Sequence, residues 1–128
     1  MSKVDFNLTS ERVLRDGREA VTVICLKGWL DAQTDMKFIS AAQDVHKQGE
    51  RNILVDLEDV DTLTSAGVRA LQKVYILFNP DKHTVHSTRM RLCNAQPQVY
   101  HVLTLTGFLQ SAPNYETRQA ALNAFDSL

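Results

Sequence analysis

The chain has 128 residues, of which 44% are hydrophobic and 23% are charged, a mixture typical of one soluble globular domain. Its 14 lysines and arginines against 15 aspartates and glutamates give a formal net charge of −1, which argues against non-specific nucleic-acid binding and against a polybasic membrane contact. No apolar run approaches the roughly 20 residues of a membrane span, and the first residues lack the apolar core of a signal peptide. We therefore expect a single cytoplasmic domain over residues 1–128, with Cys25 and Cys93 as small core residues.

The first predicted elements are two antiparallel strands. Apolar residues alternate with polar ones over residues 4–8, which is the pattern of a half-buried strand. Asp16-Gly17 is a strong hairpin signal. Residues 20–26, nearly all apolar or β-branched, are expected to form the returning strand, which Gly28 ends.

Strands and helices are then expected to alternate. Apolar residues recur at helical spacing over residues 36–45, and Gly49 is a typical stop at the C-terminal end of a helix. A short buried strand over 52–57 precedes a polar connection. The next helix is expected to begin near Ser65 and to end at Asn79-Pro80.

The last third of the chain completes the pattern. Residues 81–88 are expected to form an exposed loop, 90–93 a short strand, 96–105 a short helix and 115–128 a terminal helix. The sequence thus predicts an α/β fold with a mixed sheet of about four to five strands and about four helices. An N-terminal antiparallel hairpin is followed by right-handed strand–helix crossovers.

One edge of the predicted sheet collects three loops. Parallel strands joined by crossovers have their carboxyl ends at the same edge, which is where functional sites gather in open α/β sheets. The three loops are 28–34, 58–65 and 94–97. We therefore expect the functional site at this edge.

The most informative segment, residues 56–71, contains a strand end, an acidic stretch, two hydroxyl residues and a helix. Thr64 or Ser65 stands at the N-cap, and a cap alone stabilises a helix by about 1 kcal/mol. The alternative is that Ser65 is a phosphorylation site, because a phosphate there meets free amides and the positive end of the helix dipole. Arg69, one turn later, could pair with that phosphate. Four carboxylates precede the hydroxyl pair, with the alternative that the first of them points elsewhere: Asp56, Glu58, Asp59 and Asp61.

Other residues are candidates for contact with a partner protein. The outward face of the same helix should present Arg69, Lys73 and Ile76, at spacings of four and three residues. Trp29 is either an interface anchor, as exposed tryptophans often are, or a lid over the edge of the core.

The sequence lacks the patterns that several kinds of catalytic and metal-binding site require. The nucleophile elbow of a serine hydrolase needs glycine two residues before the nucleophilic serine, whereas the residue two before Ser65 is Leu63. His83 and His86 form a pair without a further ligand at metal spacing. The five glycines lie singly, so that no phosphate-cradling loop is present in the sequence. We expect a protein without catalytic activity, metal or cofactor.

Four motifs follow one another in the order and spacing of a known family. They are Gly28-Trp29-Leu30-Asp31 with Thr34, Asn52 to Leu57, Thr64 to Leu71, and Asn94 to Val99 with Val102 to Phe108. In these motifs the sequence resembles a STAS domain of the bacterial anti-sigma factor antagonist group, over almost the whole chain. The resemblance implies that the unphosphorylated chain binds an anti-sigma factor, itself a serine kinase, and so frees the sigma factor. It also implies that phosphorylation of Ser65 ends this binding and that a PP2C-type phosphatase restores it.

The resemblance also implies a docking surface that includes Asp31 and Thr64. With the neighbouring candidates, the predicted surface consists of Trp29, Asp31, Thr34, Asp61, Thr64, Arg69 and Lys73. The chain departs from the family in having Thr64 where the best-known switches have Asp, Trp29 in place of a polar residue, and a longer loop over 80–89. Thr64 is also a second candidate for phosphorylation, beside Ser65. The departures leave another function open, an unphosphorylated accessory or scaffold subunit of lipid or anion transport machinery or of a sensory complex.

Overall fold

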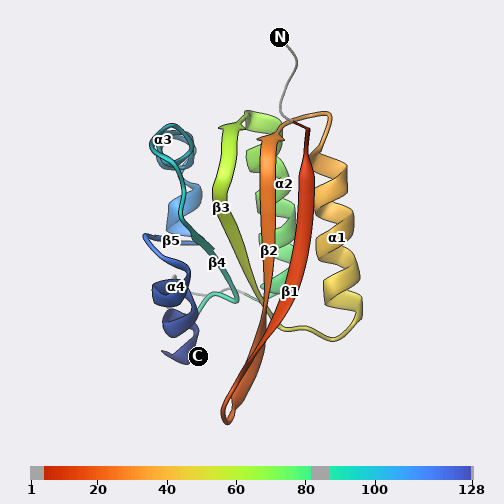
Figure 1. The fold of residues 1–128 in the computed structure, drawn as a ribbon, viewed down its shortest axis with the longest axis vertical. Coiled ribbons are helices and arrows are strands. Elements are labelled where there is room, and N and C mark those ends of the chain that lie inside the picture. The colour runs from red at the N-terminus through yellow and green to blue at the C-terminus, as the bar shows by residue number, and fades with distance from the viewer. Residues whose placement is uncertain (1–4, 82–86, 128) are drawn as a thin grey trace.

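The computed structural model describes residues 5–81 and 87–127, which form a five-stranded sheet flanked by helices (Figure 1). In chain order the elements are β1 (Asn7–Arg15), β2 (Arg18–Leu30), α1 (Asp35–Lys47), β3 (Asn52–Leu63), α2 (Ser65–Phe78), β4 (Met90–Cys93), α3 (Pro97–Leu105), the short 3-10 helix η1 (Phe108–Gln110), β5 (Asn114–Tyr115), α4 (Arg118–Ala124) and the 3-10 helix η2 (Phe125–Ser127). The strands lie in the order β1-β2-β3-β4-β5, antiparallel between β1 and β2 and parallel elsewhere. The predicted mixed α/β sheet is confirmed.

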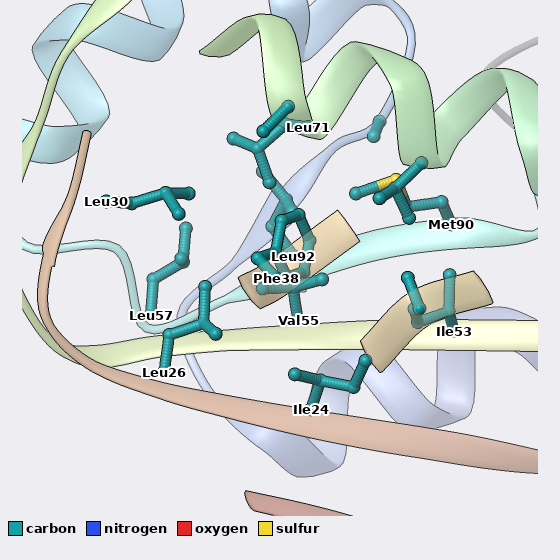
Figure 2. Close-up of a cluster of buried hydrophobic side chains, with 14 of the residues drawn as sticks. Ile24, Leu26, Leu30, Phe38, Ile53, Val55, Leu57, Leu71, Met90 and Leu92 are labelled. Carbon is teal, nitrogen blue, oxygen red and sulfur yellow. The ribbon is translucent and has the colours of Figure 1, made fainter. Parts of the chain in front are cut away.

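Strand periodicity divides the buried side chains between the two faces of the sheet. On one face, apolar residues of β2, β3 and β4 pack against α1, α2 and α3, and Figure 2 shows them gathered around Phe38 of α1 and Leu71 of α2. On the other face, Ala121 and Phe125 pack against a smaller cluster that includes Leu54 of β3. The sheet is therefore covered on both sides, which explains why β3 begins as a continuous run of buried residues.

The two central strands are longer than the sequence predicts. β3 runs through the expected polar connection to Leu63, and β2 passes Gly28 and ends at Leu30. Val60 and Leu63 are buried in this extension, whereas the acidic residues between them and before them are exposed. The acidic stretch is thus the exposed side of a strand and not a loop.

Two register shifts between β2 and β3 interrupt the sequence pattern of this extension. Between the pairs Cys25–Asp56 and Lys27–Asp59, β3 has one residue more than β2, and a second shift lies between Gly28 and Trp29. Gly28 has a φ of 97°, a left-handed conformation that glycine adopts without steric cost. Such bulges interrupt the alternation of apolar and polar residues on which strand prediction depends.

The N-terminal hairpin is confirmed, with altered bounds. Its turn is at Asp16 and at Gly17, whose φ is 64°, but the first strand covers Asn7–Arg15 instead of residues 4–8. β1 pairs with β2 and is one of the two edge strands of the sheet, the other being β5. Val4, which the prediction included, lies outside the described residues.

The C-terminal prediction is partly wrong. Helix α3 agrees with its expected bounds, but Tyr115 lies in β5, and α4 begins only at Arg118. Thr117 caps α4 by accepting a hydrogen bond from the Ala120 N–H at 3.0 Å. The loop expected over 81–88 falls mostly on residues 82–86, which lie outside the described residues. Within the described ranges, no helix has both the length and the apolar character needed to cross a membrane.

Candidate functional site

At the carboxyl edge of the sheet, the end of β2 contacts the beginning of α2. The Thr64 N–H donates to the Leu30 carbonyl oxygen at 3.2 Å. Gly67, in the first turn of α2, is buried against this junction, and a Cβ at this position would lie 2.3 Å from the Leu30 oxygen and 2.7 Å from Leu63 Cδ1. This close approach therefore requires a residue without a side chain.

Thr64 and Ser65 have different roles at the start of α2. Thr64 is the N-cap, and its Oγ1 accepts a hydrogen bond from the Gly67 N–H at 3.3 Å and lies 3.5 Å from the Leu30 oxygen. Ser65 is the first residue of the helix and is exposed. Of the two residues, Thr64 is thus the cap, and Ser65 is the exposed one.

Removing the cap oxygen should weaken the start of α2. We expect Thr64→Val to lower the free energy of unfolding by about 1 kcal/mol, because the buried Gly67 N–H then lacks its acceptor. Urea unfolding followed by circular dichroism measures the loss. Thr64→Ser retains the oxygen and should stay within about 0.5 kcal/mol of the natural protein. Equal stability of the valine and serine variants would contradict the capping role.

The loop between β2 and α1 is held by its own polar side chains. Asp31 is only 7% exposed, and its Oδ1 accepts from the Gln33 N–H at 2.9 Å. The Thr34 hydroxyl donates to the Trp29 carbonyl at 2.7 Å and accepts from the Asp31 N–H at 3.0 Å. The side chains of Asp31 and Thr34 therefore hold the shape of the loop, and little of the Asp31 carboxylate reaches the surface.

The end of β3 is tied to the start of α3 by two glutamines. Gln96 Nε2 donates to the Glu58 carbonyl at 2.7 Å, and Gln98 Nε2 donates to the Asp61 carbonyl at 2.9 Å. Both bonds use main-chain oxygens, so the carboxylates remain on the surface. Three of them are exposed along this stretch: Glu58, Asp59 and Asp61.

Asp56 points to the opposite face of the sheet from α2 and is buried. Its Oδ2 accepts from Arg118 Nη2 at 3.1 Å, and its Oδ1 accepts from the Glu58 N–H at 3.1 Å and from Asn94 Nδ2 at 3.2 Å. Arg118 Nη1 also bonds Glu11 at 2.9 Å. Partial burial lowers the pKa of Arg118, but the hydrogen bonds to Asp56 and Glu11 outweigh it and raise the pKa. This network joins α4 to the residues that lead into the acidic stretch.

Most of the predicted site residues lie at this edge or on the adjoining face of α2. Exposed are Asp61, Ser65, Arg69 and Lys73; half-buried are Trp29, Thr34 and Thr64; buried is Asp31. Trp29 lies in β2, paired with Thr62, and not in a loop as predicted.

The STAS domain family model matches residues 12–121. The chain belongs to the STAS domain family.

Relatives of this STAS domain include named anti-sigma factor antagonists. BtrV of Bordetella bronchiseptica, named as an anti-sigma factor antagonist, is 30% identical over 115 residues, which cover 89% of this chain and 94% of BtrV. The fold is similar to that of an anti-sigma factor antagonist from Mycobacterium paratuberculosis, with a TM-score of 0.75, 24% identity and coverage of 94% and 95% of the two chains. The fold is also similar to that of SpoIIAA in its unphosphorylated form, with a TM-score of 0.68, 18% identity and coverage of 94% of this chain and 98% of SpoIIAA. For Bacillus SpoIIAA in the phosphorylated form the TM-score is 0.65, with 20% identity and coverage of 91% and 97% of the two chains.

Two features of this edge of the STAS domain were not predicted from the sequence. The resemblance includes Gly67, but nothing in a single sequence shows that the Leu30 carbonyl fills the space a side chain would need. The sequence left open that Asp56 points away from the acidic stretch, but it did not predict that its carboxylate is buried and accepts a hydrogen bond from Arg118. Its partner Arg118 is 62 residues away in the sequence.

The two thiols in this region are expected to be unreactive in the folded protein. Burial, with a contribution from Asp56, raises the pKa of Cys93 from an ordinary value of 9.0 to about 12, and burial also raises the pKa of Cys25. A thiol reagent at pH 8 should therefore label the protein slowly until urea is added.

The raised pKa of Cys93 also makes the stability of the fold depend on pH. Because this pKa is higher in the folded state than in the unfolded state, the contribution of the Cys93 thiol to stability is complete below about pH 9 and is lost between pH 9 and about 12. Urea unfolding at pH 8 and pH 10 measures this loss, and the change should be smaller for Cys93→Ala.

Proposed function

We propose that this STAS domain is an anti-sigma factor antagonist that is switched off by phosphorylation of Ser65. The observation that carries the proposal is the exposure of Ser65 at the first position of α2, beside Thr64, whose hydroxyl already serves as the cap. The name of BtrV and the two forms of SpoIIAA support it. The partner is then an anti-sigma factor with serine kinase activity, and a PP2C-type phosphatase reverses the modification.

The proposed switch changes the charge of the surface and leaves the fold intact. The kinase transfers the γ-phosphoryl group of ATP to Ser65 Oγ and releases ADP and a proton; the phosphatase hydrolyses the ester to serine and inorganic phosphate. A phosphoserine adds about −1.5 to −2 charges at neutral pH. The amino end of a helix tolerates this charge, because its amides and dipole are favourable to anions. Glu58, Asp59 and Asp61 are exposed along the preceding strand, so the added charge enlarges an acidic surface.

The proposed docking surface surrounds Ser65. The loop from Asp31 to Thr34, shaped by its internal hydrogen bonds, lies beside the start of α2 through the contact of Leu30 with Thr64. Arg69 and Lys73 follow on the exposed side of α2. A kinase surface adapted to the loop and to the neutral serine would be repelled by a phosphate at the centre of this contact.

The test is phosphorylation by the kinase of the same organism. Incubation with kinase and ATP, followed by mass spectrometry of the peptides, should place one phosphate on Ser65 and none on Thr64. Ser65→Ala should abolish incorporation while retaining kinase binding, and Thr64→Val should still be modified at Ser65. Phosphate on Thr64 in the natural protein, or incorporation that persists in Ser65→Ala, would overturn the assignment.

Binding provides a second measurement. Ser65→Asp introduces one negative charge and should weaken binding to the kinase by about tenfold or more, with phosphorylated protein weaker still. Ser65→Asn has a similar shape without the charge and serves as the matched control. Equal affinity of the aspartate and asparagine variants would contradict repulsion by charge.

A further inference from the structure

Part of the helical side of the molecule is built from a stretch of sequence that is almost free of acidic residues. Between Asp61 and Glu116 the only carboxylate is that of Asp81, although the chain has 15 acidic residues. Helices α2 and α3 and the turn η1 all belong to this stretch. Asp81 follows the far end of α2 and lines a cavity with His46 and Glu50. The surface formed by α2, α3 and η1 therefore has no carboxylate from its own residues.

This surface contains a groove between α2 and the α3–η1 turn. The groove has a volume of about 320 Å³ and is lined by Gln72, Tyr75, Ile76, Thr106, Gly107, Phe108 and Ser111. Tyr75 and Phe108 pack edge to face, with ring centroids 6.4 Å apart. Ile76 is 66% exposed, and Leu105, next to Thr106 in the sequence, is 73% exposed. Large apolar side chains so exposed beside a concave apolar surface are typical of a protein interface.

One arginine and one lysine extend this surface along α2. Lys73 is three residues before Ile76 and Arg69 four residues before Lys73, so the three lie on one side of the helix, and all are exposed. Among residues 5–81 and 87–127, neither cation forms an ion pair. The arginines that do form one are Arg12, Arg15, Arg18, Arg89 and Arg118. Arg69 and Lys73 are therefore available to carboxylates of another molecule.

We propose that the groove between α2 and η1 binds an acidic amphipathic helix of a protein partner. An apolar side chain of that helix enters the groove between Ile76 and Phe108, and carboxylates one and two turns away meet Lys73 and Arg69. Helices bind grooves in this way through anchors spaced three, four and seven residues apart. Among residues 5–81 and 87–127, α1 is the one α-helix that contains carboxylates, and its apolar face is buried in the core, so this part of a second copy presents no such helix. Two cations are also fewer than the four to eight of a typical anionic-lipid site.

The test is a titration of the isotope-labelled protein, followed by amide chemical shifts. The probe is a synthetic helical peptide of about 15 residues with leucines on one side and glutamates on the other. We expect shifts at the groove residues and along the Arg69–Ile76 side of α2, with affinity that falls as salt rises. The matched peptide with lysine in place of glutamate should produce no such shifts.

Variants separate the groove from other surfaces. Ile76→Gln and Lys73→Glu should each weaken binding of the acidic peptide by about tenfold, whereas Lys47→Glu, an equal change of net charge on α1, should not. Ile76→Gln should leave phosphorylation of Ser65 unchanged, so that a failure of the groove and a failure of the proposed switch are distinguishable. Equal binding of the lysine peptide, absence of shifts in the groove, preferential binding of phosphatidylserine vesicles, or self-association that Ile76→Gln removes would each overturn the proposal.

Discussion

Gly67→Ala is expected to destabilise the domain by about 2–3 kcal/mol and to reduce kinase binding, although alanine is the better helix former. The added methyl group would lie 2.3 Å from the Leu30 carbonyl oxygen and 2.7 Å from Leu63 Cδ1. Neither atom belongs to a flexible side-chain end exposed to solvent, so β2 and α2 must move apart. This separation breaks the hydrogen bond from the Thr64 N–H to Leu30.

Urea unfolding and hydrogen exchange measure the two consequences. The exchange of the amides of Thr64 and Gly67 should become faster in Gly67→Ala, together with those of the loop from Asp31 to Thr34. Ser65→Ala, two residues away on the exposed side, is the control and should change stability by less than about 0.5 kcal/mol. A Gly67→Ala variant as stable as the natural protein would show that the junction has room for a side chain.

Arg118→Ala is expected to destabilise the protein by about 2 kcal/mol, because it leaves the carboxylate of Asp56, which is 5% exposed, without its cationic partner. The Arg118 side chain is itself 36% exposed, so solvent screens the pair and the loss is smaller than for a fully buried one. The remaining donors are the Glu58 N–H and the side-chain amide of Asn94. The loss should also loosen α4 on the sheet, which near-ultraviolet circular dichroism would detect.

A double-mutant cycle isolates the contact between the two residues. Combined with Asp56→Asn, Arg118→Ala should be less destabilising than on its own, with a coupling energy of about 1–3 kcal/mol. Glu11→Gln removes only the exposed contact of Arg118 and should cost at most about 1 kcal/mol. Additive effects of the two substitutions would mean that Arg118 acts through α4 alone and not through Asp56.

The fold could be predicted because its elements obey simple periodicities. The apolar stripe of α2 repeats at helical spacing, and the run at 52–57 is buried on both sides of the sheet, as a central parallel strand should be. The prediction failed where the alternation is interrupted, since the register shifts beside Cys25 and Gly28 conceal six further residues of β3. β5 has two residues, which is too short for any periodic signal.

The sequence predicts which segments form the candidate site, but not the hydrogen bonds and contacts of the individual side chains within it. The Thr64-Ser65 pair before an apolar helix identifies a helix start, yet only the geometry at Gly67 distinguishes the cap from the exposed hydroxyl. Asp31 shows the same limit, because the sequence predicts its place in the docking loop but not the hydrogen bonds that its carboxylate accepts from Gln33 and Thr34. The groove beside η1 depends on contacts between residues some 30 positions apart, which a single sequence does not reveal.

The half-buried position of Trp29 has a practical consequence. It is the one tryptophan of the chain and lies in β2 next to Leu30, whose carbonyl receives the Thr64 N–H. Indole fluorescence depends on how much water surrounds the ring, and Trp29 is in the strand that leads into the proposed docking loop. Excitation at tryptophan wavelengths therefore follows the one fluorophore that this chain contributes, so that the proposed switch can be timed by stopped flow without a label on the chain.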